Sequence, residues 1–167
     1  MHKSNTHGPK QENWIPWLMA VAESAPWWVR LRCDPKRLGE VSQAAFLVKA
    51  RMMGFKVAIP WGDSERYDFI VWAKEGGPFL RVQVKGTGRL HRRGYEIQAV
   101  HQTRHGKKRY TKKDIDILAG HVQPNDVWYL IPIENVGHTK SLRFYPDIRT
   151  RNPRWEAWRD NWDVLGS

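Results

Sequence analysis

The chain has 167 residues, a formal net charge of +11, and ten Trp within a hydrophobic fraction of 41%. This length suffices for one domain with a hydrophobic core, and the composition argues against disorder. No apolar run approaches the roughly 20 residues that span a bilayer, no signal peptide is evident, and the lone Cys33 excludes an intramolecular disulfide. We therefore expect a cytoplasmic protein with no membrane partner.

The first half of the chain predicts a disordered tail over residues 1–12 and then a single domain over residues 13–167, whose core covers about 39–146. Asn13–Ala25 reads as a short helix, and Gly39–Met53 as the best helix of the chain. An apolar stripe on this second helix is expected to face the core: Val41, Ala44, Ala45, Val48 and Met52. A strand at Phe55–Ile59 and a hairpin of Tyr67–Ala73 with Phe79–Lys85 follow.

The second half predicts a further strand at Tyr95–Val100 and a basic loop that is too polar to pack, Gln102–Arg109. Thr111 is a suitable N-cap for a helix that runs to about His121. Val127–Ile131 is an apolar run typical of a buried strand. An edge strand at Leu142–Tyr145 and a helix at Pro153–Leu165 complete an α/β fold with a central mixed sheet flanked by helices.

The hairpin places polar residues on one face of a strand. Side chains alternate along a strand, so Arg81, Gln83 and Lys85 share a face, whereas Leu80, Val82 and Val84 share the other. Asp68 lies in the neighbouring apolar strand, where Asp is disfavoured and costly to bury. This combination indicates a reaction centre, although each residue alone also has a structural explanation.

Glu40 begins the long helix and adds a second acid. Because Mg²⁺ keeps several of its waters, Glu40 and Asp68 suffice as its protein ligands. Lys85 is then placed to orient or deprotonate a water that attacks a phosphodiester, with Gln83 as a hydrogen-bonding partner of that water. Taken alone, Glu40 is better explained by the favourable charge it brings to a helix start.

Positive charge is concentrated in one segment. Arg81 to Lys113 holds eleven of the 28 Lys and Arg, with Glu96 as its single acid. Such a density indicates either a polyanion-binding surface or a solvated loop. The residues expected to contact DNA are Arg81, Arg89, Arg92, Arg93, Arg104, Lys107, Lys108, Arg109, Lys112 and Lys113.

The series GEVSQAAFLVKARMMGFKVAIP, YDFIVW and FLRVQVKG resembles the PD-(D/E)xK nuclease superfamily. It is most similar to the small endonuclease branch that includes group I intron-encoded homing enzymes. The later segments YTKKDIDILAG and DVWYLIPIENV share this similarity. The resemblance implies a restriction-endonuclease-like core and Mg²⁺-dependent (or Mn²⁺-dependent) hydrolysis of double-stranded DNA. It also implies a homodimer or homotetramer, because two centres are needed to cut two strands.

By position, Asp68 matches the Asp of the motif, Lys85 its Lys, and Glu40 the helix acid of many members. Gln83 stands where the motif usually has Asp or Glu, which removes one negative charge from the expected metal site. The sequence therefore predicts a DNA endonuclease. Two alternatives remain: a non-catalytic DNA-binding protein on the same fold, and a structure-specific junction resolvase.

Overall fold

The computed structural model describes residues 35–62, 64–73, 77–147 and 154–166. All of them belong to one compact unit, Asp34–Ser167. The predicted tail and the predicted helix at Asn13–Ala25 lie outside the described residues. No helix within the described ranges has the length and apolar character needed to cross a membrane.

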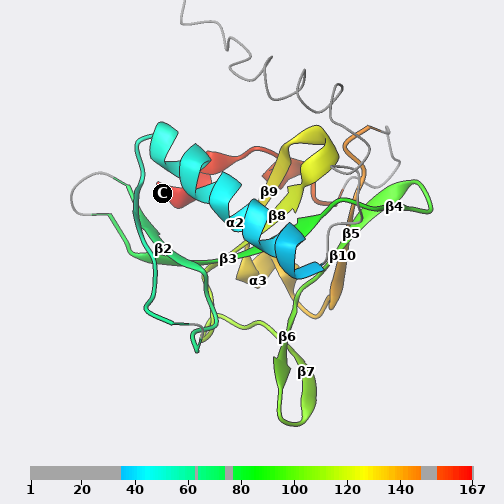
Figure 1. The fold of residues 1–167 in the computed structure, drawn as a ribbon, viewed down its shortest axis with the longest axis horizontal. Helices are drawn as coiled ribbons and strands as arrows, with labels where there is room; N and C mark the ends of the chain where they lie inside the picture. Colours follow the sequence, from blue (N-terminus) through cyan, green and yellow to red (C-terminus); the bar gives the residue numbers. More distant parts are fainter. Residues whose placement is uncertain (1–34, 63, 74–76, 148–153, 167) are drawn as a thin grey trace, which may run out of the picture. The chain divides into compact units, whose positions relative to one another are not determined.

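A five-stranded mixed sheet forms the centre of this unit (Figure 1). Its strands, in spatial order, are β1 (Lys56–Ala58), β2 (Phe69–Trp72), β3 (Leu80–Thr87), β8 (Ile117–Val122) and β9 (Val127–Pro132). Only the β3–β8 pair is parallel, and the other three pairs are antiparallel. The predicted central mixed sheet is therefore confirmed.

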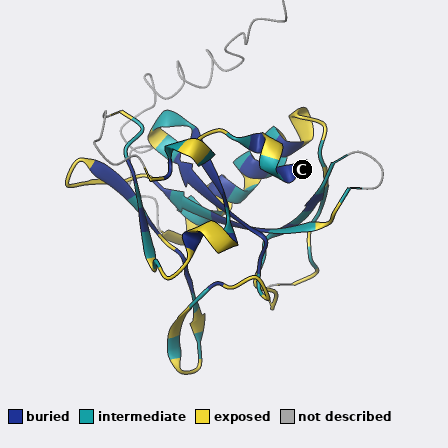
Figure 2. Ribbon diagram, turned by 180° about the vertical axis from the view of Figure 1, so that it is seen from behind, coloured by how far each residue is buried: buried dark blue, intermediate teal, exposed yellow. Residues whose placement is uncertain are grey.

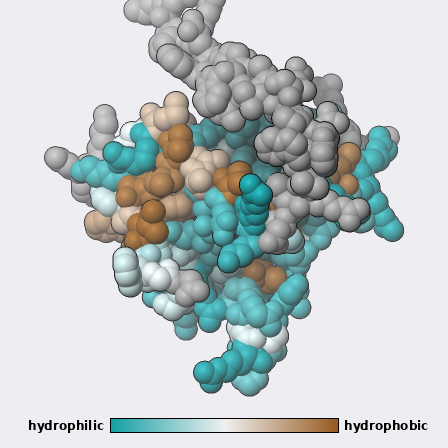
Figure 3. Space-filling view, in the orientation of Figure 1, coloured by the Kyte–Doolittle hydropathy of each residue, from teal (hydrophilic) through white to brown (hydrophobic). Residues whose placement is uncertain are grey.

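Helix α2 (Pro35–Met52) covers one face of this sheet. Its buried residues are Ser42, Phe46 and Ala50, and Phe46 packs against Phe69, Trp128 and Trp162. The predicted core stripe is wrong, since Val41, Val48 and Met52 are about half exposed or more. Polar Ser42 can face the sheet because it is hydrogen-bonded to His121 and Gln123 there. Figure 3 shows hydrophobic residues gathered on the outer face, on the side where α2 ends.

A second, three-stranded sheet packs on the opposite face of the central sheet, as the buried layer in Figure 2 indicates. It has the order β10 (Ser141–Phe144), β5 (Gly94–Gln98) and β4 (Leu90–His91). Phe144 stacks on Tyr129 of β9 at 4.0 Å between ring centroids. The shorter elements are the helix α3 (Ile133–Val136) and the 3-10 turns η1 (Gln123–Asn125), η2 (Glu156–Trp158) and η3 (Trp162–Leu165).

Three predicted elements have a different conformation. The basic loop is a hairpin of β6 (Val100–Thr103) and β7 (Gly106–Arg109), which projects from the sheets (Figures 1 and 2). The helix predicted after Thr111 is a single turn followed by β8, whose apolar residues are buried on both faces. The helix predicted over Pro153–Leu165 is two separate 3-10 turns, because Asp160 has a positive φ between them.

Helix α2 approaches the sheet closely at Gly86 of β3, and we expect Gly86→Ala to destabilise the fold by about 1–3 kcal/mol. A Cβ at this position would overlap Ser42 Oγ, which cannot rotate away without losing its bonds to His121 and Gln123. Denaturant unfolding measures the effect. The control is Gly39→Ala in α2, where a Cβ meets no atom within 4 Å. Equal stability of the two variants would contradict this packing.

Candidate active site

Asp68 lies immediately before β2, where this strand meets β3. Its backbone N–H donates to the Val82 carbonyl at 2.9 Å, which fixes the residue beside Gln83. Its Oδ2 accepts hydrogen bonds from the Val84 N–H at 2.7 Å and from Gln83 Nε2 at 2.5 Å. The structure therefore brings together two of the predicted site residues, Asp68 and Gln83, through direct contacts.

The predicted alternation of β3 is confirmed. Leu80, Val82 and Val84 belong to the core beneath α2. On the polar face, Lys85 directs its ammonium over the ring of Tyr110, with Nζ 5.6 Å from the ring centroid. Tyr110 is buried. Asp68 is near enough for its charge to act on the Lys85 ammonium.

Burial shifts both ionisable groups of this cluster. It raises the pKa of Asp68, although the Val84 N–H and the charge of Lys85 oppose the shift. It also lowers the pKa of Lys85, against the influence of Asp68. Each shift favours the neutral form of its group, which is the expected effect of a partly dehydrated site. Such shifts are common where proton transfer takes place.

The helix contributes a residue that the sequence reasoning missed. Gln43 Nε2 donates to Asp68 Oδ1 at 2.9 Å, so α2 reaches the cluster through an amide. Glu40 lies on the same helix and is exposed. Within the described ranges, no hydrogen bond or ion pair joins Glu40 to Asp68, Gln83 or Lys85. Residues three apart share a helix face, so the position of Gln43 relative to Glu40 was the available signal.

The donor atoms around Asp68 suit a hard divalent cation. The Gln83 amide presents its nitrogen to Asp68 Oδ2. The oxygen atoms near the cluster are those of the Asp68 carboxylate and of the backbone carbonyl groups of the neighbouring strand. Oxygen ligands of this kind are those that Mg²⁺ prefers. No group of three or more His, Cys, Asp or Glu able to hold a metal ion occurs among the residues that the structure describes. A cation at this cluster would therefore depend on one carboxylate, neutral oxygens and water.

Arg81 shares the polar face of β3 but is held by Asp116. The Asp116 carboxylate accepts from the Arg81 backbone N–H at 2.9 Å and from its Nε at 3.0 Å. The remaining guanidinium nitrogens donate to the carbonyl groups of Lys112 and Lys113, each at 2.6 Å. Burial alone would raise the pKa of Asp116, but the Arg81 hydrogen bonds hold it below its usual value. These hydrogen bonds of Arg81 fix the segment that precedes β8.

The other cations predicted to contact DNA are mostly exposed. Arg92 and Arg93 form the β4–β5 turn, with φ values of 45° and 69°. The β6–β7 hairpin carries Arg104, Lys107, Lys108 and Arg109, and Arg109 Nη1 lies 2.6 Å from His138 Nδ1. Lys112 pairs with Asp116 and with Glu134. Arg89 and Lys113 are exposed.

The sequence matches the PD-(D/E)XK endonuclease family over residues 33–165. Since this match covers most of the chain, the protein belongs to that family. The fold is similar to the solved structure of a bacterial homing endonuclease, I-Ssp6803I, with a TM-score of 0.68 and 24% sequence identity. The alignment covers 79% of this chain and 93% of the homing endonuclease. No curated protein matches the sequence.

At this level of identity the likeness shows the fold, which is restriction-endonuclease-like. The match to the endonuclease family confirms the predicted membership of the nuclease superfamily. The cluster of Asp68, Gln83 and Lys85 is the candidate active site, because the sequence analysis expects the family motif at these residues and Asp68 is in contact with Gln83.

Proposed function

We propose that the protein is a metal-dependent DNA endonuclease that hydrolyses phosphodiester bonds at the cluster of Asp68, Gln83 and Lys85. One observation carries the proposal. In a chain of the endonuclease family, Asp68 accepts a hydrogen bond from Gln83, and Lys85 lies on the same strand face with a lowered pKa. DNA is the proposed substrate because the surrounding cations complement a polyanion.

In this proposal Asp68 would hold Mg²⁺ or Mn²⁺, and Glu40 would join it from α2. When bound, such an ion supplies positive charge that stabilises the negative charge developing on the phosphoryl oxygens. Because Gln83 is neutral, the site has one negative charge fewer than a site with an acid at this position. We expect metal binding to be correspondingly weak.

Lys85 and Gln83 act on the attacking water. Gln83 fixes its position by hydrogen bonding, and Lys85 Nζ, in its neutral form, accepts the proton as the water oxygen attacks phosphorus. The bond from phosphorus to the 3′ oxygen breaks, and solvent supplies the proton for that oxygen. The products are a 5′-phosphate and a 3′-hydroxyl. Burial favours the proton-accepting form of Lys85, since it penalises the ammonium.

The predicted DNA contacts are the cations of the β4–β5 hairpin, of the β6–β7 hairpin and around Lys113. They are expected to bind the backbone, with an affinity that falls as salt rises. Arg81 and Lys112 contribute positive charge from within their ion pairs. We propose that the active form is a homodimer or homotetramer, since one centre cuts one strand at a time.

Cleavage of supercoiled plasmid, linear DNA and branched DNA in Mg²⁺, Mn²⁺ or EDTA tests the proposal. We expect nicking or linearisation with either metal, none in EDTA, and product ends that a ligase can rejoin without phosphate addition. Preference for the branched substrate would identify a junction resolvase. Salt-sensitive binding without cleavage of any substrate would identify a DNA-binding protein and would contradict the catalytic role.

A further inference from the structure

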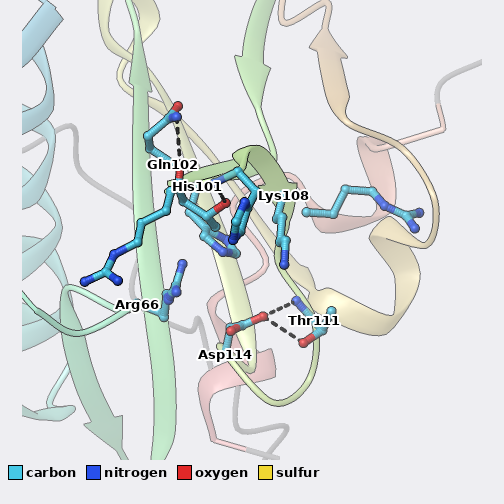
Figure 4. Close-up of a pocket in the computed structure, with 10 residues that line it drawn as sticks. Arg66, His101, Gln102, Lys108, Thr111 and Asp114 are labelled. Atoms are coloured by element: carbon cyan, nitrogen blue, oxygen red, sulfur yellow. Dashed lines mark hydrogen bonds between the residues drawn. The ribbon is translucent and has the colours of Figure 1, made fainter.

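A basic pocket lies beside the candidate active site, between the β6–β7 hairpin and the segment before β2. Its volume is about 710 Å³. Its walls include Arg66, His101, Lys108, Thr111 and Asp114. Figure 4 shows Arg66 on one side of His101 and Lys108 on the other.

The charge of this pocket suits an anion. Within the described residues, the side chains of Arg66 and Lys108 form no hydrogen bond or ion pair, and Lys108 is paired only through its backbone in the β6–β7 hairpin. The carboxylate of Asp114, which is the single acid of the lining, is already bonded to the N–H and the hydroxyl of Thr111 at 2.9 and 2.7 Å. Arg66 and Lys108 therefore line a pocket whose only acidic side chain already accepts hydrogen bonds from Thr111.

His101 adds an unused polar atom. Its Nδ1 is buried and has no hydrogen-bond partner within the part of the chain that the structure describes. Buried polar atoms are nearly always paired, so an isolated one requires an explanation. Burial lowers the pKa of His101, and the charges of Arg66 and Lys108 lower it further, although Asp114 opposes them. A neutral imidazole can donate one hydrogen bond, and a turn of the ring would bring the buried Nδ1 to a phosphate oxygen in the pocket.

Tyr110 connects the pocket to the reaction centre. The Lys85 Nζ lies 5.6 Å from the centroid of the Tyr110 ring. The centroid of the His101 ring lies 5.0 Å from the same ring centroid. The ring of Tyr110 therefore lies between Lys85 and the His101 wall of the pocket. A DNA strand with one phosphate at Lys85 carries its next phosphate within a nucleotide of that position.

We propose that this pocket is a second phosphate subsite, which binds a phosphodiester neighbouring the scissile one on the strand being cut. The proposal rests on the proposed function, because that function places the scissile phosphate at Lys85. Arg66 and Lys108 supply the charge, and His101 supplies a hydrogen bond. The subsite positions the strand and takes no part in the proton transfer.

Binding of short thymidine oligonucleotides in EDTA tests the subsite. The probes are the trinucleotide TpTpT, which has two phosphodiesters, and its two forms with one linkage replaced by neutral methylphosphonate. We expect the wild-type protein to bind the fully charged probe about 10-fold more tightly than either neutralised form, which corresponds to about 1.4 kcal/mol. The double variant Arg66→Gln, Lys108→Gln should bind all three within about twofold.

The matched control is the double variant Lys56→Gln, Lys140→Gln, which removes two exposed cations outside the pocket and should retain the 10-fold difference. The imidazole NMR signal of His101, assigned by its loss in His101→Gln, should shift with the fully charged probe. An unchanged 10-fold difference in the Arg66, Lys108 variant, or no difference in the wild type, would overturn the subsite. Wild-type protein that shows the difference but never cuts DNA would retain the subsite and disprove the catalytic role.

Discussion

Asp68→Asn is expected to remove DNA cleavage and, at the same time, to make the fold more stable. Cleavage should fall by about 10²–10⁴-fold, because the carboxylate would hold the metal ion that stabilises the transition state. The substitution keeps an oxygen that can accept from the Val84 N–H, but it removes a charge that burial disfavours. Residues selected for catalysis often reduce stability in this way.

The stability gain should depend on pH. Since the pKa of Asp68 is raised in the folded state, its ionisation costs stability as pH rises through that pKa. Below pH 3.8, the ordinary value, the carboxyl is protonated in both folded and unfolded chains, so wild type and variant should differ least. Near neutral pH the variant should melt higher by about 2–4 °C, the shift that about 1 kcal/mol produces in a domain of this size.

Thermal unfolding from pH 3.5 to 8, together with plasmid cleavage, measures both effects. Asp163→Asn is the control, since Asp163 is exposed and should change neither cleavage nor the pH dependence of melting. A variant that melts below the wild type at neutral pH would contradict the cost of burying Asp68. A variant that still cuts DNA at the wild-type rate would remove Asp68 from the mechanism.

The sequence was sufficient to predict the core of the site. Strand alternation places Gln83 and Lys85 on one face whatever the rest of the fold, and an Asp within an apolar strand needs nearby polar groups. The first inference depends on the fixed period of two, and the second on the cost of burying a charge. They hold in the structure, where Asp68 and Gln83 are in contact.

Features that depend on distant partners were not predictable from periodicity. The run Ile117–Val122 fits a helix or a buried strand equally well, and pairing with β3 decides for the strand. The buried face of α2 is set by the approach of Gly86 to Ser42, not by the most apolar stripe. Arg81 resembled its basic neighbours in the sequence, yet Asp116, 35 positions later, holds it.

Lys85→Met is expected to lower the cleavage rate of bound DNA by about 10²–10⁴-fold. The Met side chain keeps most of the apolar stem against Tyr110 but cannot accept a proton. Because burial lowers the pKa of Lys85 from 10.5, the wild-type rate should rise with pH and reach a plateau below that value. The residual rate of the variant should lack this dependence.

The most direct test of the Asp68, Gln83 and Lys85 centre is the single-turnover cleavage rate of one plasmid in Mg²⁺ by purified wild type, Lys85→Met and the exposed control Lys56→Met. We predict that wild type and control cut at the same rate, with ligatable ends, and that Lys85→Met is slower by at least about 10²-fold. Equal rates for all three proteins would contradict a reaction centre at Lys85.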